Sequence, residues 1–142
     1  MSTNTLERVT QKLLDEAKSM GANEADVIAT EGQSISVDVR QGSLENADRA
    51  EGVEVGLRVL VSNKQAIVSS SNISDDTLKI MVERAIAMAK DAPKDKYAGL
   101  ASEDQLAKEL NLSSLEICDV APEPSPLKLQ EEAKKAESSA LE

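Results

Sequence analysis

Residues 53–61 read VEVGLRVLV and carry the strongest strand signal in the chain. Gly56 and Leu60 fall on one face of this strand. The other face carries aliphatic residues at alternate positions: Val53, Val55, Leu57, Val59 and Val61. The turn-forming residues 62–64, Ser-Asn-Lys, then lead into a second strand at residues 65–71. Because so short a connection cannot cross over to a parallel strand, the pattern predicts an antiparallel hairpin.

A second hairpin is predicted upstream of the first. Residues 25–31 form a short strand candidate, and residues 34–40 alternate between polar and aliphatic side chains, with Ile35, Val37 and Val39 on one face. Gln41 and Gly42 provide a turn, after which residues 43–49 can return as a weakly specified strand, with a helix as the alternative. The sequence therefore predicts an antiparallel, hairpin-built sheet of four to five strands.

Two amphipathic helices flank this sheet in the sequence. The first has an apolar stripe, with Asn4 and Glu7 spaced as a capping box and Gly21 placed for a left-handed cap. Its stripe consists of Leu6, Val9, Leu13, Ala17 and Met20. The second begins after Ser74 and ends before Pro93. Its stripe consists of Leu78, Met81, Val82, Ala85, Ile86 and Ala89. Both stripes need an apolar partner, so we expect an α+β fold with two long helices on one face of the sheet.

The C-terminal third has weaker signals. We expect irregular chain over residues 91–100, a short capped helix over residues 102–110 and an extended connector over residues 113–121. Pro122, Pro124 and Pro126 then mark a boundary before a helix over residues 127–141. The predicted organisation is an α+β domain at residues 1–121, and at residues 122–142 a connector and helix leading toward a further domain.

Charge and composition narrow the function classes. The formal net charge is −10, from 26 acidic and 16 basic residues, so phosphate backbones and anionic membranes are repelled. We therefore expect no direct nucleic-acid binding and no membrane association. The N-terminus lacks the features of a secretion signal, and we expect a cytoplasmic protein. The single cysteine, Cys118, has no histidine partner and is predicted to be a small buried residue.

Several of these segments, in this order, resemble the N-terminal region of the TldD/PmbA family, a family of gyrase modulators and metallopeptidase-related proteins. The resemblance covers essentially the whole chain and rests on residues 34–37 with 40–45, residues 56–61, and residues 69–72 followed by Ser74. Residues 97–100, Tyr-Ala-Gly-Leu, are similar to a segment of PmbA-like members. Lys96, Ala66 and Leu60 depart from the family pattern, which affects loop rigidity and local packing rather than the fold.

The resemblance implies a function for the intact complex rather than for this chain. TldD-type members carry a His-Glu-x-x-x-His zinc motif in their larger C-terminal portion. This chain has no histidine. The resemblance thus implies a non-catalytic domain of a PmbA-like subunit, inactive alone, that acts in assembly or substrate channelling. Its partners would be a TldD-like catalytic subunit or a second copy, with a peptide substrate. Zinc is expected only in the catalytic subunit.

No catalytic or metal-binding residue is predicted within the chain. Serines 69–71 and the pair Asp75 and Asp76 are interpreted as a polar strand end and a helix cap. Arg40, Arg58 and Tyr97 are candidate partner contacts. The two arginines can instead pair with neighbouring acids, and Tyr97 can instead anchor its loop onto the second helix. Two rival functions stay open: a stand-alone module that binds a peptide at a sheet edge, and a gyrase-modulating interaction protein.

Overall fold

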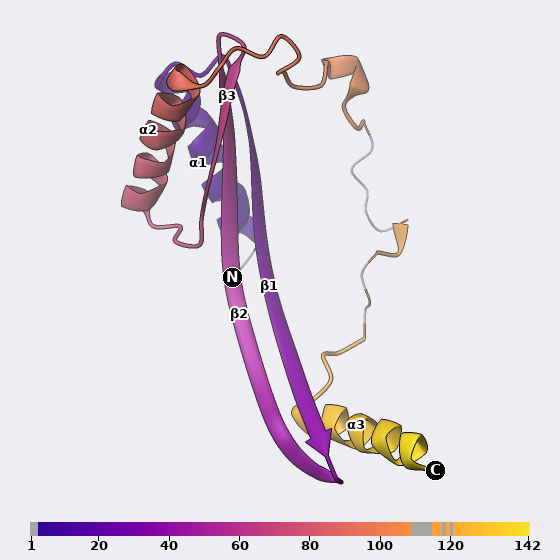
Figure 1. Cartoon of the computed structure of the whole chain (residues 1–142). Coiled ribbons are helices and arrows are strands. Elements are labelled where there is room, and N and C mark those ends of the chain that lie inside the picture. The colour runs from indigo at the N-terminus through magenta and orange to yellow at the C-terminus, as the bar shows by residue number, and fades with distance from the viewer. Residues whose placement is uncertain (1–2, 109–114, 118, 120) are drawn as a thin grey trace. The chain divides into compact units, whose positions relative to one another are not determined.

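The computed structural model describes residues 3–108, 115–117, 119 and 121–142 (Figure 1). Its elements are α1 (Thr3–Ser19), β1 (Glu24–Arg40), β2 (Ser43–Val61), β3 (Lys64–Ser70), α2 (Asp75–Asp91), the 3-10 turn η1 (Glu103–Gln105) and α3 (Pro126–Leu141). The strands form one sheet in the order β1-β2-β3. The predicted α+β class with an antiparallel sheet is therefore confirmed. Residue contacts divide the chain into two compact units, unit 1 (Met1–Gly32 and Gly52–Leu106) and unit 2 (Gln33–Glu51 and Ala107–Glu142).

The described residues form three strands, so the expected count of four to five is wrong. The predicted strands 25–31 and 34–40 are one strand, β1, and the predicted strands 43–49 and 53–61 are one strand, β2, because each continues through the intervening glycine, Gly32 or Gly52. Neither glycine has a positive φ, and a Cβ added at either would meet nothing within 4 Å. Glycine adopts extended backbone as readily as a turn, and here cross-strand pairing decides between the two. The helix alternative for residues 43–49 is also wrong, since they belong to β2.

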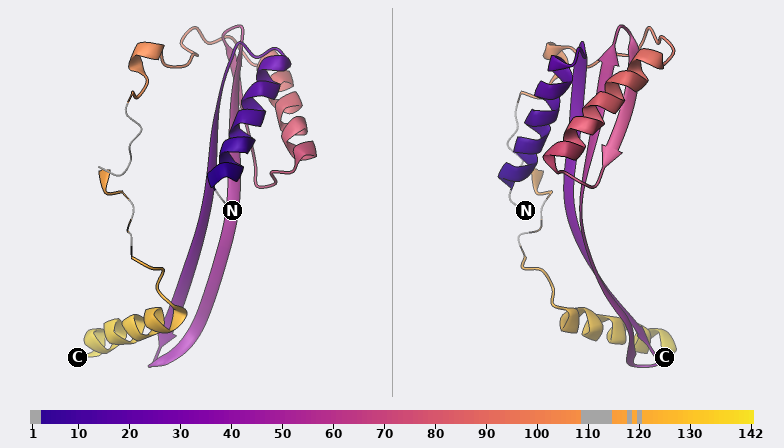
Figure 2. Two further views of the ribbon diagram at one scale, coloured as in Figure 1. Left: turned by 180° about the vertical axis from the view of Figure 1, so that it is seen from behind. Right: turned by 90° about the vertical axis from the view of Figure 1, so that its left-hand side faces the viewer.

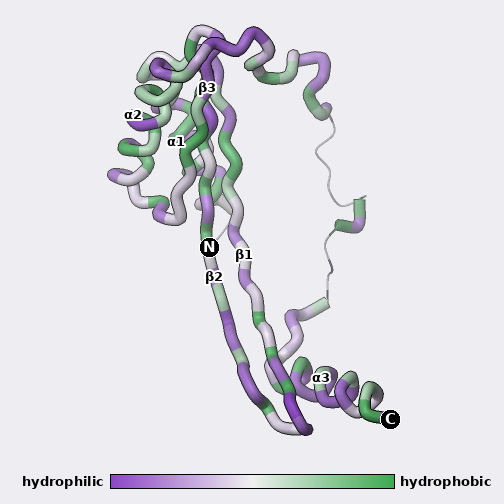
Figure 3. The backbone as a smooth tube through the Cα atoms, viewed as in Figure 1, coloured by the Kyte–Doolittle hydropathy of each residue, from purple (hydrophilic) through white to green (hydrophobic). Residues whose placement is uncertain are grey.

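The core of unit 1 lies between the sheet and two helices. Figure 2 shows α1 and α2 side by side on one face of the sheet. All six residues of the predicted α2 stripe are buried, as are Val9, Leu13 and Ala17 of α1. The strands contribute Val55, Leu57, Val59, Ala66 and Val68 to the same cluster. Figure 3 shows this concentration of hydrophobic residues along the backbone. The aliphatic periodicities of α2 and of residues 53–61 thus identified most of the core. The predicted face of Ile35, Val37 and Val39 is only half-buried and lies outside this cluster.

The pairing of β2 with β3 determines which side chains face away from the helices. Leu57 lies opposite Val68 on the helix-covered face, and Arg58 lies opposite Ile67 on the other. The connection between these strands uses Ser62 and Asn63 with φ values of 52° and 60°, as in a type I′ hairpin turn. The predicted hairpin is therefore confirmed.

The helix ends agree with the sequence only in part. Gly21 has a φ of 97°, and the Ala22 N–H donates to the Ala17 carbonyl at 3.0 Å, which is the pattern of a Schellman cap. The capping box expected at Asn4 is wrong, because α1 already includes Thr3. At α2, Ser74 is the N-cap residue, but its hydroxyl contacts the Thr77 hydroxyl at 2.9 Å rather than the backbone.

The chain after α2 forms less helix than expected. Residues 103–105 make a single 3-10 turn, with Ser102 and Gln105 forming a capping box. Leu106 then adopts extended dihedral angles, which ends the turn well before residue 110. The last two residues of the predicted helix, parts of the predicted connector and Cys118 lie outside the described residues. The C-terminal helix is confirmed as α3, where the Ser125 hydroxyl accepts a hydrogen bond from the Lys128 N–H.

Candidate interaction surface

The face of the unit 1 sheet opposite the helices presents charged and apolar side chains together. Ile28 of β1 and Ile67 of β3 are 68% and 64% exposed on this face. Asp26 of β1, and Gly56 and Arg58 of β2, line the same face. These five residues, here called the open face, line a hollow of about 260 Å³ together with Val27. Contiguous apolar patches rimmed by polar side chains mark interaction surfaces, whereas single exposed aliphatic side chains are ordinary on protein surfaces.

An ion pair forms the polar centre of the open face. The Arg58 Nε donates to Asp26 Oδ1 at 2.8 Å, and its Nη2 donates to Oδ2 at 2.6 Å. Both side chains are partly exposed, at 33% and 47%. The hydrogen bond to Asp26 raises the pKa of Arg58, and partial burial acts in the opposite direction. Two parallel hydrogen bonds fix the guanidinium plane, so the pair gives this face a defined polar geometry.

A glycine shapes the hollow between the strands. A Cβ at Gly56 would lie 3.3 Å from the Ile28 Cγ2, which is tighter than an ordinary van der Waals contact. The φ of Gly56 is not positive, so the backbone itself does not require glycine here. The absent side chain instead lets Ile28 lie directly over β2.

The three predicted contact residues lie in different surroundings. Arg58 is on the open face in unit 1, whereas Arg40 belongs to unit 2. Arg40 contacts Glu45 at 3.3 Å, and the two side chains are 72% and 54% exposed. The prediction that both arginines pair with neighbouring acids is confirmed. Whether either arginine contacts a partner stays a prediction.

Tyr97 does not anchor its loop onto α2, so that interpretation is wrong. Its side chain is 83% exposed, and the Lys96 Nζ lies 4.8 Å from the ring centroid. The loop is held by its backbone instead. The Asp95 N–H donates to the Asn63 carbonyl at 2.7 Å, and the Leu100 N–H donates to the Glu24 carboxylate at 3.2 Å. The ring is thereby left available for contact.

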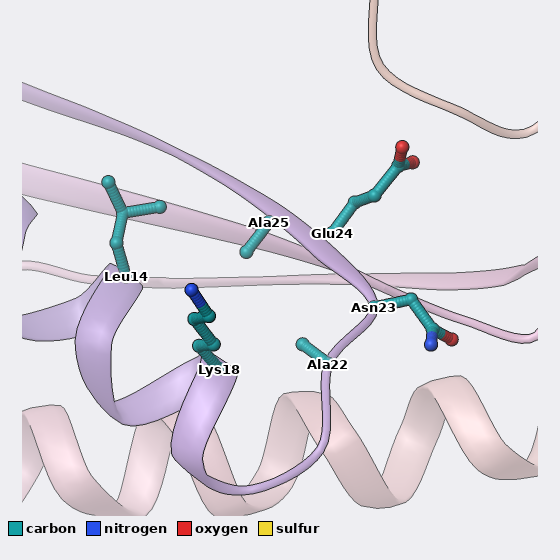
Figure 4. Close-up of a pocket in the computed structure, with 6 residues that line it drawn as sticks. All are labelled: Leu14, Lys18, Ala22, Asn23, Glu24 and Ala25. Atoms are coloured by element: carbon teal, nitrogen blue, oxygen red, sulfur yellow. The ribbon is translucent and has the colours of Figure 1, made fainter.

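A second hollow of about 230 Å³ lies at the connection between α1 and β1 (Figure 4). The picture shows Lys18 on the helix side and Glu24 pointing away from it. Asn23 accepts a hydrogen bond from the Ser62 N–H at 2.8 Å, and Glu24 accepts one from Leu100. These polar groups hold neighbouring backbone in place and do not converge on a common point. We therefore regard this hollow as structural.

The described residues show no arrangement typical of catalysis. Within them, no three His, Cys, Asp or Glu side chains gather as a metal site would require. The Ser70 hydroxyl is hydrogen bonded to the backbone of Asn72 at 3.0 and 3.1 Å, in agreement with a polar strand end. None of the helices in the described ranges combines the length and apolar character needed to cross a membrane.

The sequence had not singled out Asp26, Ile28 or Ile67. Alternation in residues 65–71 does place Ile67 on the face opposite Ala66 and Val68, so a lone isoleucine on a wet face was a detectable signal. Asp26 was not detectable in this way, because it lies 32 residues from Arg58 and meets it only through strand pairing.

Comparisons with known proteins agree on one family. Residues 25–89, which include β2, β3, nearly all of β1 and most of α2, match the family described as PmbA/TldA metallopeptidase domain 1. The chain is 32% identical over 91 residues to the metalloprotease PmbA homolog of Haemophilus influenzae, covering 64% of this chain and 20% of that protein. It is 29% identical over 139 residues to metalloprotease PmbA of Escherichia coli O157:H7, covering 93% of this chain and 30% of that protein. The chain thus spans less than a third of the length of these relatives.

Solved structures show the same fold. TldE from Thermococcus kodakarensis matches with a TM-score of 0.69 and 18% identity, over 93% of this chain and 29% of that chain. A "putative modulator of DNA gyrase" from Bacteroides thetaiotaomicron matches with a TM-score of 0.71 and 19% identity, over 77% of this chain and 24% of that chain.

Proposed function

Because the chain carries an N-terminal domain of the TldD/PmbA family, we propose that it acts as a non-catalytic domain of a PmbA-like subunit in a metallopeptidase complex. Its role is assembly, with the open face as the surface that a TldD-like catalytic subunit contacts, and through that contact it helps to channel the peptide substrate. The assignment to a PmbA-like rather than a TldD-like subunit is supported by residues 97–100 and by the names of both curated relatives.

The observation that carries this proposal is the pair of exposed isoleucines on the open face, Ile28 and Ile67. Burying one isoleucine side chain contributes about 1.5–3 kcal/mol. The Arg58–Asp26 pair beside them presents a polar group of fixed geometry, and a contact surface combines such groups with apolar anchors. No helix of unit 1 covers this face (Figure 2).

In this proposal, peptide hydrolysis and its zinc belong to the catalytic subunit. Protein zinc sites are built mainly from histidine and cysteine, and this chain has no histidine and one cysteine. The chain supplies binding area and orientation rather than proton transfer or a nucleophile. The cytoplasmic location stays a prediction from the sequence.

The test is co-purification with a TldD-like homologue that carries the paired-histidine motif. The untagged 142-residue chain should be retained by the tagged homologue. The complex should persist at moderate salt, because the contact is partly apolar and salt screens only its charged part. A tagged protein of similar size and charge without the family fold serves as the control. Equal recovery of the chain with the homologue and with the control protein would contradict the proposal.

A second candidate function is favoured by the two edges of the sheet. In the order β1-β2-β3, both β1 and β3 are edge strands. An edge strand can accept an extended peptide as an additional strand. Such a stand-alone module should bind an extended peptide without any TldD-like subunit. If its target is gyrase, it should likewise bind a gyrase subunit on its own. Absence of binding in such a titration at low salt would exclude it.

A further inference from the structure

The turn between β1 and β2 binds a carboxylate of the same chain. Gln41 and Gly42 form this turn with φ values of 50° and 72°. The Gln41 N–H donates to Glu137 Oε1 at 2.6 Å, and the Gly42 N–H donates to Glu137 Oε2 at 2.7 Å. Glu137 belongs to α3, and all three residues lie in unit 2.

This geometry is that of an anion-binding turn. Two successive N–H groups in left-handed backbone converge on one acceptor, and each oxygen of the carboxylate receives one hydrogen bond. Hydrogen bonds to an ionised acceptor are about twice as strong as those between neutral groups. The adjacent arginine, Arg40, contacts Glu45 rather than Glu137, so the backbone supplies the recognition.

A second carboxylate holds the segment before α3 to the same hairpin. The Gln33 Nε2 donates to Glu123 Oε2 at 2.8 Å, and the Gln33 Oε1 accepts from Arg49 Nη2 at 3.2 Å. Glu123 precedes α3 and Glu137 lies within it, so two acidic side chains bind the hairpin from one continuous segment. A tethered carboxylate of this kind has a high effective concentration, which offsets the repulsion expected from a net charge of −10.

We propose that the Gln41–Gly42 turn is a carboxylate-binding site whose resident ligand is Glu137, so that it docks α3 on the hairpin. When Glu137 is absent, the turn is open to a carboxylate from another molecule, such as the side chain of an acidic peptide. This site does not depend on the proposed subunit role, because it uses no residue of the open face.

Amide hydrogen exchange, read residue by residue by NMR, tests this site in the intact chain. Glu137→Ala should speed exchange of the Gln41 and Gly42 amides by roughly tenfold, since charge-assisted hydrogen bonds protect them. Glu132→Ala removes the same charge from the exposed side of α3 and should leave both amides unchanged. Glu137→Gln keeps the size of the side chain and should give an intermediate effect. A circular dichroism spectrum confirms that α3 still forms.

The ligand class is tested with sodium acetate. In Glu137→Ala, acetate should shift the Gln41 and Gly42 amide resonances downfield in a saturable manner, and sodium chloride at the same concentration should not. If the Gln41 and Gly42 amides exchange at the same rates in Glu137→Ala as in wild type, the docking of Glu137 would be overturned. An identical response to acetate and chloride would overturn the site as a carboxylate receptor.

Discussion

Arg58 of β2 binds Asp26 of β1 through two parallel hydrogen bonds of 2.8 and 2.6 Å. The two residues are 32 positions apart in the sequence, and strand pairing brings them together on the face that the helices leave uncovered. Ile28 and Ile67 lie beside this pair. The open face thus has a fixed polar pair beside apolar side chains, which is the feature on which the proposed function depends.

The Arg58–Asp26 pair should contribute modestly to stability. A double-mutant cycle of Arg58→Ala and Asp26→Ala should give a coupling free energy of about 0.2–1 kcal/mol, because both groups are partly solvated. The coupling should fall as salt is added. Urea unfolding provides the free energies. The control cycle, Arg40→Ala with Glu45→Ala, involves a longer contact and more exposed side chains, and its coupling should be smaller. A larger coupling in the control would contradict this account of the pair.

Replacing Gly21 by alanine should lower the free energy of unfolding, whereas the same replacement at Gly32 should not. Gly21→Ala places an L-residue at a φ of 97° and should lower the free energy of unfolding by about 1–2 kcal/mol. Gly32→Ala, within β1, meets no atom within 4 Å and needs no positive φ, so stability should be unchanged or slightly higher. Thermal unfolding of the two variants gives the comparison. Equal losses in both variants would mean that the cap at the end of α1 is not formed as described.

Leu57 should be a major contributor to the core. Its side chain is fully buried, so Leu57→Ala should lower the free energy of unfolding by about 2–5 kcal/mol through lost burial and a residual cavity. Leu106→Ala makes the same substitution at a side chain that is 55% exposed, and should change stability by less than about 0.5 kcal/mol. The measurement is urea denaturation of both variants. Similar effects at the two sites would contradict the assigned core.

The ion pair between α1 and α2 should make the stability of the fold depend on pH in the acidic range. The Lys12 Nζ lies 2.7 Å from Asp75 Oδ1, and this hydrogen bond lowers the pKa of Asp75 from its ordinary value of 3.8. A group with a depressed folded-state pKa stabilises the fold above its unfolded pKa, and that contribution is lost as pH falls through the folded value. Asp75→Asn should therefore lower Tm at neutral pH, and the difference from wild type should shrink below pH 3.8.

Two controls separate this effect from general charge effects. Asp76→Asn removes the same charge from the same first turn of α2, and should change the acid dependence less. Added salt should reduce the effect of Asp75→Asn at neutral pH, because Asp75 is 66% exposed. A difference between Asp75→Asn and wild type that grows as pH falls would contradict the sign of this prediction.

Much of the fold could be predicted from local patterns. The α2 stripe from Leu78 to Ala89 was buried as predicted, because helical periodicity alone decides which face is apolar. The turn at Ser62 and Asn63 followed from residues that tolerate positive φ. The C-terminal cap at Gly21 followed for the same reason.

The remainder depended on pairings that no local pattern determines. Gly32 and Gly52 appeared as strand boundaries because glycine is typical of turns, yet cross-strand pairing keeps both extended. The contact between Asp26 and Arg58 could not be predicted, because it forms only when the strands pair. The exposure of Ile67 could not be predicted either, because it depends on which face of the sheet the helices of unit 1 leave uncovered. The loop-anchor alternative for Tyr97 rested on its residue type alone, whereas hydrogen bonds from the backbone hold that loop.

The most direct test of the central claim is the dissociation constant between this chain and a TldD-like catalytic subunit, measured by titration calorimetry. Ile67→Glu alters the open face, and Ile80→Glu makes the same change at an isoleucine of α2 that is 52% exposed. If the open face is the contact surface, Ile67→Glu should weaken binding by about tenfold to hundredfold, and Ile80→Glu should leave it unchanged. Unaltered binding by Ile67→Glu, or equal weakening by both substitutions, would contradict the account.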